Sequence, residues 1–132
     1  MKYILCLLLF VPLFLFGQRD KVFTSLHEAY SKPEKVYQLN LYYTQLTEVP
    51  NNIDTFANLK KLNLSANKIE ELPESICNLV NLDELNLMNT NISDLPKNFG
   101  NLKNIDHLHI QGTKITAFPK SIKKLKKLKH FG

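Results

Sequence analysis

The chain has 132 residues, of which 22% are charged and 44% are hydrophobic, and its formal net charge is +5. This length allows one domain at most. A uniformly basic surface is excluded, because seven lysines and no acidic residue follow from Lys114 onward, whereas residues 18–113 carry nine basic and twelve acidic residues.

The first 17 residues are typical of a secretory signal peptide. Lys2 gives a positive start, and residues 4–16 form an almost unbroken apolar run. This run is shorter than the roughly 20 residues that a membrane-spanning helix needs. We therefore predict a signal peptide over residues 1–17 with cleavage near Gly17 and Gln18, and an uncleaved anchor is the alternative.

The two cysteines give no disulfide framework. Cys6 lies in the predicted signal peptide and would be removed with it, leaving Cys77 alone in the mature chain. A single cysteine forms no internal bridge, so the mature domain must be stabilised by stacked apolar layers. We interpret Cys77 as structural, because no base nearby in the sequence would activate its thiol.

Residues 18–35 are predicted to form an N-terminal cap that contains a short helix over residues 24–31. Ser25 and Glu28 have the spacing of a capping box, and Pro33 ends the segment. The helix would cover the first strand of the domain that follows, and a frayed linker is the alternative.

The remaining chain repeats every 23 residues. Prolines recur at Pro50, Pro73, Pro96 and Pro119, and apolar residues recur at fixed places around them. Such a period indicates a repeat architecture, in which each unit buries its apolar side against its neighbours. Alternating apolar and polar residues predict strands over residues 36–41, 59–64, 82–87 and 105–110.

Residues 59–73 fit the pattern L-x-x-L-x-L-x-x-N-x-I-x-x-L-P at every defined position. This pattern resembles the 23-residue leucine-rich repeat of bacterial secreted proteins and Ras-group-related repeat proteins, over residues 36–131. The resemblance implies an α/β repeat solenoid over residues 36–132. It would be a curved stack of four to five units with a concave parallel sheet and short helical or irregular convex segments. It also implies protein–protein recognition.

One column departs from the family pattern. The family's buried asparagine, which hydrogen-bonds the loop backbone, is replaced by threonine in three of the four repeats: Thr44, Asn67, Thr90 and Thr113. Asparagine offers two donors and an acceptor, whereas threonine offers one donor and two lone pairs. We therefore expect a less uniform set of loop hydrogen bonds.

The last residues continue the repeat pattern. Leu128 and Phe131 occupy the positions of a further strand at the end of the sequence. Two alternatives stay open: the chain is truncated, or Lys129 and His130 protect the last strand by their charge.

The side chains that point outward from the strands form the candidate partner-binding surface. Its members are Gln38, Asn40, Tyr42, Lys61, Asn63, Ser65, Glu84, Asn86, Met88, His107, His109 and Gln111. We expect Tyr42, Lys61, Glu84, Met88 and His109, near the centre, to matter most. With strands about 4.8 Å apart the patch is about 15–20 Å long, enough for a peptide or a small protein epitope. A solvated face without a ligand is the alternative.

Four side chains on this surface are zinc-type ligands. His107 and His109 point the same way on one strand, and Glu84 and His130 fall in the His107 column of the adjacent repeats. Residues two apart on a strand are about 6.6 Å apart, whereas zinc–nitrogen bonds measure about 2.0–2.1 Å. We therefore interpret them as surface residues and predict no metal site.

Residues 120–130 resemble a basic amphipathic helix. The repeat register explains their apolar residues, so we predict a convex segment with lysines at solvent positions. This positive patch would make weak, salt-sensitive contact with an anionic surface through Lys123, Lys124, Lys126 and Lys127. The acidic residues near the repeat junctions are interpreted as solubilising charges: Glu70, Glu71, Glu74 and Asp94.

The sequence contains no nucleophile elbow, phosphate loop or metalloprotease helix. We predict an exported protein–protein interaction module that is periplasmic, at the cell surface or extracellular. It would be no enzyme and have no cofactor, no nucleic-acid partner and no transmembrane span after signal removal. The alternatives are an envelope-associated docking element that uses the lysine-rich end and a truncated remnant of a longer repeat protein.

Overall fold

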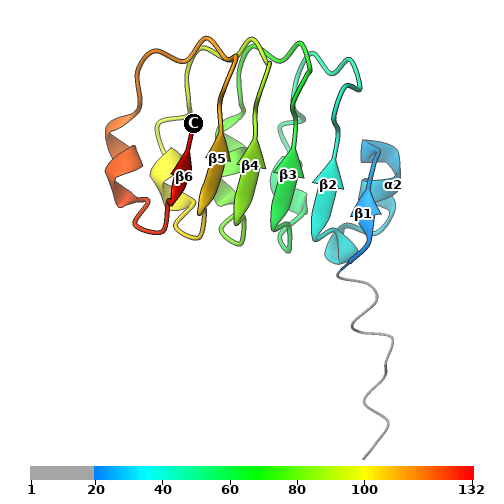
Figure 1. Cartoon of the computed structure of the whole chain (residues 1–132). Helices are drawn as coiled ribbons and strands as arrows, with labels where there is room; N and C mark the ends of the chain where they lie inside the picture. Colours follow the sequence, from blue (N-terminus) through cyan, green and yellow to red (C-terminus); the bar gives the residue numbers. More distant parts are fainter. Residues whose placement is uncertain (1–19) are drawn as a thin grey trace, which may run out of the picture.

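The computed structural model describes residues 20–132, so the predicted signal peptide, its cleavage site and Cys6 lie outside the described residues. Within this range six short parallel strands form one sheet, in which sequence neighbours are neighbours in space (Figure 1). The strands are β1 (Val22–Phe23), β2 (Gln38–Asn40), β3 (Lys61–Asn63), β4 (Glu84–Asn86), β5 (His107–His109) and β6 (His130–Phe131).

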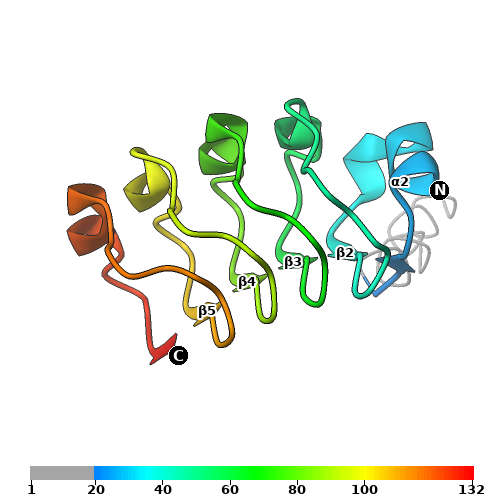
Figure 2. The same cartoon turned by 90° about the horizontal axis from the view of Figure 1, so that it is seen from above.

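The sheet forms one side of a curved stack, and short helices form the other, convex side (Figure 2). Four 3-10 helices lie on this side: η2 (Ile53–Thr55), η3 (Glu74–Asn78), η4 (Phe99–Asn101) and η5 (Lys120–Lys124). A repeating proline precedes each of these helices by one to three residues. In each repeat the proline carbonyl accepts a hydrogen bond from the N–H three residues on, at 2.9–3.1 Å. The chain thus alternates between strand and helix once per repeat, as the predicted solenoid requires.

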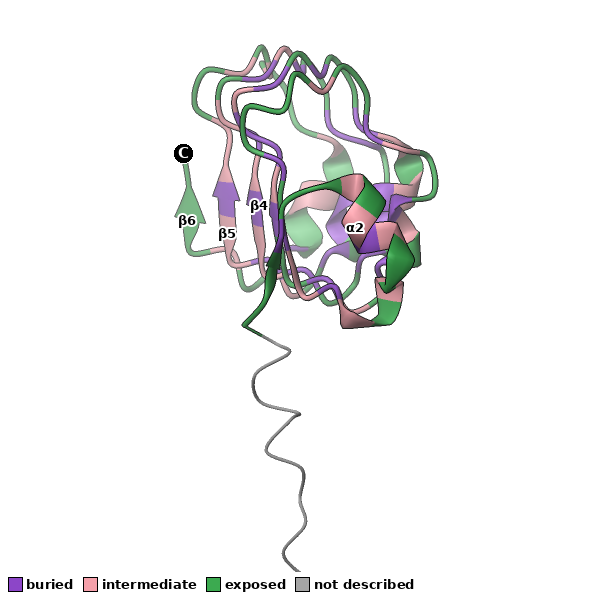
Figure 3. Cartoon of the chain, turned by 90° about the vertical axis from the view of Figure 1, so that its right-hand side faces the viewer, coloured by how far each residue is buried: buried purple, intermediate pink, exposed green. Residues whose placement is uncertain are grey.

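The register of the sheet confirms the 23-residue period. Leu39 pairs with Leu62, Leu62 with Leu85, and Leu85 with Leu108. These leucines are at most 1% exposed and stack into one continuous core that also holds Phe56 and Phe99 (Figure 3). Strands β2 to β5 are three residues long rather than the predicted six. Strands β2, β3 and β4 each end at an asparagine that caps the turn that follows, and Asn63 Oδ1, for example, accepts from Ser65 N–H at 3.0 Å.

Asparagines that recur every 23 residues form hydrogen bonds between successive layers near the convex side, a role that the sequence analysis did not predict. The side-chain amides of Asn58, Asn81 and Asn104 donate to the carbonyls of Glu34, Ala57 and Val80 in the preceding layer, at 2.8–2.9 Å. The fourth repeat has Lys127 at this place, and its Nζ donates to Asn104 Oδ1 at 2.6 Å. The column therefore links successive layers from one end of the stack to the other.

The N-terminal end is covered by more than the predicted helix. Helix α2 (Leu26–Ser31) is present, and Ser25 Oγ accepts from Glu28 N–H at 3.2 Å, as the capping-box spacing predicts. It is followed by η1 (Pro33–Lys35). Strand β1 was not predicted: it pairs with β2 and places the buried Phe23 beside Leu39, so residues 18–35 are not a helical cap alone. The offset between these two residues is 16 rather than 23, which is why a fixed-period reading misses β1.

The last strand lies where the repeat pattern predicts it. Strand β6 pairs with β5 and brings Phe131 beside Leu108. Phe131 is 47% exposed and Phe118 is 40% exposed, and their rings meet edge to face with centroids 5.0 Å apart. In residues 20–132 no helix has the length and apolar character needed to cross a membrane.

Candidate partner-binding face

The loops that carry part of this face are held by one buried amide. Asn67 is 5% exposed, and its Oδ1 accepts from Thr44 N–H at 3.1 Å and from Leu46 N–H at 2.9 Å. Its Nδ2 donates to the carbonyls of Leu41, at 2.7 Å, and Leu64, at 2.9 Å. Asn67 therefore connects its own repeat with the preceding one.

The threonines of the same column make fewer bonds. Thr90 Oγ1 donates to the Leu87 carbonyl at 2.7 Å, and Thr113 Oγ1 donates to the Ile110 carbonyl at 2.8 Å. Neither hydroxyl reaches the backbone of the repeat before it in the described chain. The expectation of a less uniform set of loop hydrogen bonds is thus confirmed.

The sheet assembles the predicted columns of outward-facing residues. Gln38, Lys61, Glu84, His107 and His130 pair in register across the five strands from β2 to β6. Asn40, Asn63, Asn86 and His109 form the next column on β2 to β5. That these side chains bind a partner stays a prediction.

The charged residues of this face are largely paired with one another. Lys61 Nζ lies 3.2 Å from Glu84 Oε2, so two residues expected to contact a partner contact each other. Beside them Lys60 Nζ lies 3.8 Å from Asp83 Oδ2. The sequence analysis did not predict this second pair. Its two residues directly precede Lys61 and Glu84, which were predicted to share a column. Because all four side chains are solvent-accessible, each pair contributes only about 0–1 kcal/mol of stability.

Three imidazoles gather on β5 and β6. The rings of His107 and His130 are stacked with centroids 4.5 Å apart, and His109 lies 6.2 Å from His107. His107 Nδ1 lies 2.7 Å from Asp106 Oδ1, and this hydrogen bond is the main cause that lowers the pKa of Asp106. Asp106 was not among the predicted site residues. Within residues 20–132 no group of three or more His, Cys, Asp or Glu side chains could hold a metal ion.

The C-terminal ends of strands β2, β3 and β4 carry uncharged polar side chains on this face. Asn40, Asn63 and Asn86 each accept, through Oδ1, a hydrogen bond from the N–H two residues on. The distances are 3.1 Å to Tyr42 N, 3.0 Å to Ser65 N and 3.0 Å to Met88 N. Ser65 differs from expectation: it is only 6% exposed, and its hydroxyl donates to Asn63 Oδ1 at 2.6 Å, so it is not available to a partner.

Two tyrosines lie beside this uncharged part. Tyr42 is 60% exposed and Tyr43 is 66% exposed, with ring centroids 6.1 Å apart. The sequence reading found Tyr42 but missed Tyr43. Tyr43 has a left-handed φ of 53°, as do the residues in its column, Ala66, Asn89 and Gly112. This backbone turn, which the side-chain alternation of a strand does not reveal, leaves Tyr43 exposed beside Tyr42.

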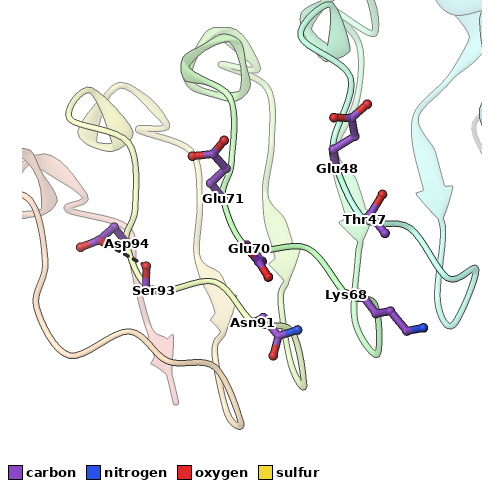
Figure 4. A pocket seen from close by; sticks show the side chains of 8 residues that line it. All are labelled: Thr47, Glu48, Lys68, Glu70, Glu71, Asn91, Ser93 and Asp94. Atoms are coloured by element: carbon purple, nitrogen blue, oxygen red, sulfur yellow. Dashed lines mark hydrogen bonds between the residues drawn. The ribbon is translucent and has the colours of Figure 1, made fainter.

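An open hollow of about 780 Å³ lies along the loops that lead from the strands to the convex side (Figure 4). Its acidic residues are Glu48, Glu70, Glu71 and Asp94. These carboxylates come from three successive repeats and point in different directions, and Asp94 accepts from Ser93 Oγ at 2.9 Å. The arrangement agrees with solubilising charges and does not converge on a ligand.

The lysine-rich segment is convex, as the register predicts. It forms helix η5 and the turn that follows, with Leu125 buried and four lysines exposed: Lys123, Lys124, Lys126 and Lys127. Cys77 occupies a buried position on helix η3, and burial, with a smaller contribution from Glu74, raises the pKa of its thiol to about 11. A thiol that stays protonated at neutral pH suits the predicted structural role.

The comparisons define the class of protein. Residues 58–79 match the family model described as Leucine Rich Repeat. A comparison with curated proteins found no match. Solved structures with the same fold include leucine-rich-repeat ectodomains of plant receptor kinases, which confirms the resemblance and the curved solenoid. The chain thus has the curved solenoid fold of leucine-rich-repeat proteins and matches their family model at residues 58–79, and its assignment to the bacterial or Ras-group-related subtype stays a prediction.

Three of these structures give the scale of the likeness. The plant peptide hormone receptor RGFR1 in complex with RGF2 is 29% identical over 82% of this chain, with a TM-score of 0.66. The receptor kinase SOBIR1 ectodomain from Arabidopsis thaliana is 26% identical over 69%, with a TM-score of 0.63. An internalin, InlF, from Listeria monocytogenes is 23% identical over 83%, with a TM-score of 0.68. The chain covers only 17% of the RGFR1 chain, 52% of the SOBIR1 chain and 32% of the internalin chain.

Proposed function

We infer that the protein is an interaction module that binds a protein or a peptide on its concave face. The observation that carries this proposal is the set of outward-facing columns, which lie in register on the sheet and, except for Ser65, are not needed for the core. Exposed tyrosine rings and half-buried amide, thioether and imidazole groups suit a recognition surface. The structure of RGFR1 in complex with RGF2 offers a precedent in the same fold.

The proposal extends to export and to the lack of catalysis. The apolar run of residues 4–16 supports a signal peptide, and the similar SOBIR1 structure is an ectodomain. The module would act outside the cytoplasm, in the periplasm, at the cell surface or in the medium. Its contribution would be binding alone, without a cofactor.

Site-specific photo-crosslinking tests the face. A photoreactive side chain is placed at Met88 on the concave face or, as a matched control, at the exposed convex residue Val80. The full-length chain is expressed in its native host and irradiated. We expect a covalent adduct from position 88 and none from position 80. An adduct from position 80 alone, or from neither position, would contradict binding on the concave face.

A second function is supported by the lysine-rich end. Lys123, Lys124 and Lys126 are exposed on the convex side, and within residues 20–132 none of them forms an ion pair. Such a patch would attract an anionic surface in a salt-dependent manner. Co-sedimentation with vesicles of phosphatidylglycerol and phosphatidylcholine at low and high salt tests it. Binding that persists at high salt, or after these lysines are changed to glutamine, would contradict this function.

A further inference from the structure

Three identical amides lie in one row across the concave sheet. Asn40 pairs with Asn63, and Asn63 pairs with Asn86, on the adjacent strands β2, β3 and β4. Each side-chain oxygen accepts from a backbone N–H, and only the oxygen of a carboxamide can accept. The backbone therefore fixes the orientation of all three amides.

This orientation turns the row into a set of donors. The Oδ1 atom of each amide is directed to the backbone, so the Nδ2 group, with its two hydrogens, is directed away from it. Within residues 20–132 these three Nδ2 groups have no hydrogen-bond partner, whereas the oxygen of Asn63 also accepts from the Ser65 hydroxyl. A fitting ligand is rich in acceptors and poor in donors.

The spacing of the row selects the shape of such a ligand. Adjacent strands lie about 4.8 Å apart, so Asn40 and Asn86 are about 9.6 Å apart along the row. A polyproline II helix rises about 3.1 Å per residue with three residues per turn, so its carbonyls on one side repeat about every 9.3 Å. An extended β-strand repeats about every 6.6 Å, which fits neither one strand spacing nor two.

An aromatic surface lies at one end of the row. Tyr42 follows Asn40 by two residues, and the exposed rings of Tyr42 and Tyr43 are 6.1 Å apart at 37° to each other. Proline-rich segments in the polyproline II conformation dock on exposed aromatic side chains in several unrelated folds. Proline also lacks an N–H group, so it leaves no donor unmatched against a donor row.

We propose that the amide row of Asn40, Asn63 and Asn86, together with Tyr42 and Tyr43, binds a proline-rich segment in the polyproline II conformation. The segment lies across β2, β3 and β4, with carbonyls one helical turn apart on Asn40 and Asn86 and proline rings on the tyrosines. This inference rests on the proposed function and names the class of partner that the concave face takes.

The test uses a ten-residue polyproline peptide and a Gly-Ser peptide of equal length, each titrated into the protein and followed by amide shifts in NMR spectra. The key variant is N40D/N86D, because aspartate keeps the oxygen that accepts from the backbone and replaces the amide donor. Its matched control, N51D/N101D, adds the same charge at two exposed convex positions. The melting temperature of each variant is measured first, and N40D alone, at an exposed residue, serves if N40D/N86D is unstable.

The wild-type protein and N51D/N101D are expected to bind polyproline with the same affinity and to bind the Gly-Ser peptide at least about ten-fold more weakly. N40D/N86D should weaken polyproline binding about ten-fold, the size expected from losing one or two good hydrogen bonds. Tyr42→Ala should also weaken it about ten-fold, because it removes one of the aromatic rings on which a proline ring docks. Equal affinity of wild type and N40D/N86D, equal affinity for both peptides, or no binding of polyproline would overturn the inference. The proposed function is judged separately by the crosslink at position 88, so the two can fail independently.

Discussion

The layers around β3 and β5 carry an isoleucine at the same place in the repeat but bury it to different degrees. Ile69, Ile92 and Ile115 occupy one column, but Ile69 and Ile92 are fully buried whereas Ile115 is only partly buried. The side chain is identical in all three repeats. Burial in a solenoid is therefore supplied by the neighbouring layers and not by the repeat itself.

Buried hydrogen bonds between neighbouring layers also distinguish the region around β3 from the region around β5. Asn67 bonds the backbone of two repeats, whereas Thr113 bonds the Ile110 carbonyl of its own repeat. Near the convex side the exposed side chains of Asn81 and Lys127 each donate to the layer before their own, so this column does not distinguish the two regions. The layers around β3 are consequently tied together by buried hydrogen bonds, and those around β5 and β6 are not.

The largest effect is expected from Asn67→Ala. The change leaves buried carbonyls and N–H groups of two repeats without partners, each at a cost of about 1–3 kcal/mol. We expect a loss of about 4–5 kcal/mol in the free energy of unfolding, measured by urea denaturation. Thr113→Ala is the matched control, with an expected loss of about 1 kcal/mol. Equal losses in the two variants would show that the layers are held equally.

The second largest loss of stability is expected when isoleucine is truncated in the same column of two layers. Ile92→Ala removes a fully buried side chain and should cost about 3 kcal/mol of stability, because it leaves a cavity between two layers. Ile115→Ala should cost about 1 kcal/mol, since this residue is partly exposed already. Thermal and urea unfolding of both variants measures the difference. A larger loss for Ile115→Ala would reverse the comparison.

Helices η4 and η5 approach closely, and Gly100→Ala tests this contact. A Cβ atom at Gly100 would lie 2.0 Å from the Ser121 carbonyl oxygen, so the two helices would have to move apart. Cys77, in the same column, has room for its side chain. We expect Gly100→Ala to lower stability by about 2 kcal/mol. Cys77→Ala, the control, should cost about 1 kcal/mol by loss of a small buried group, and an unchanged Gly100→Ala protein would contradict the close approach.

The smallest effect is a gain. Thr90→Asn should restore the amide that Asn67 has one repeat earlier and add bonds to the neighbouring backbone. We expect about 1 kcal/mol of added stability, which is the usual net value of one hydrogen bond. Differential scanning calorimetry should then show a melting temperature several degrees higher. A lower melting temperature would mean that the layer around Thr90 has no room for the larger side chain.

Much of the fold could be predicted from the sequence, because a 23-residue period fixes which residues share a column. The pairing of Leu62 with Leu85, and of Leu85 with Leu108, follows from the period alone. Strand β1 could not be predicted in this way, since Phe23 joins the leucine column after 16 residues rather than 23. Its place is decided by tertiary packing in the N-terminal cap.

The sequence also predicts which residues share a column on the candidate face. It does not predict the ion pairs and hydrogen bonds that these side chains form with one another. Which side chain reaches sideways depends on rotamers, so the Lys61–Glu84 ion pair and the Asp106–His107 hydrogen bond were missed. The burial of Ser65 depends on the turn made by Asn63, and the exposure of Tyr43 depends on a left-handed backbone. A pattern of apolar and polar residues carries no signal for either feature.

The side chain of Asn67 makes unfolding of the first layers cooperative. Because this one amide holds the backbone of two successive repeats, neither repeat can open without breaking hydrogen bonds of the other. In native-state hydrogen exchange, the amide protons of Thr44 and Leu46 should therefore exchange only through global opening. Those around Ile115 should exchange through local fraying, so that the molecule opens from the β6 end toward β1.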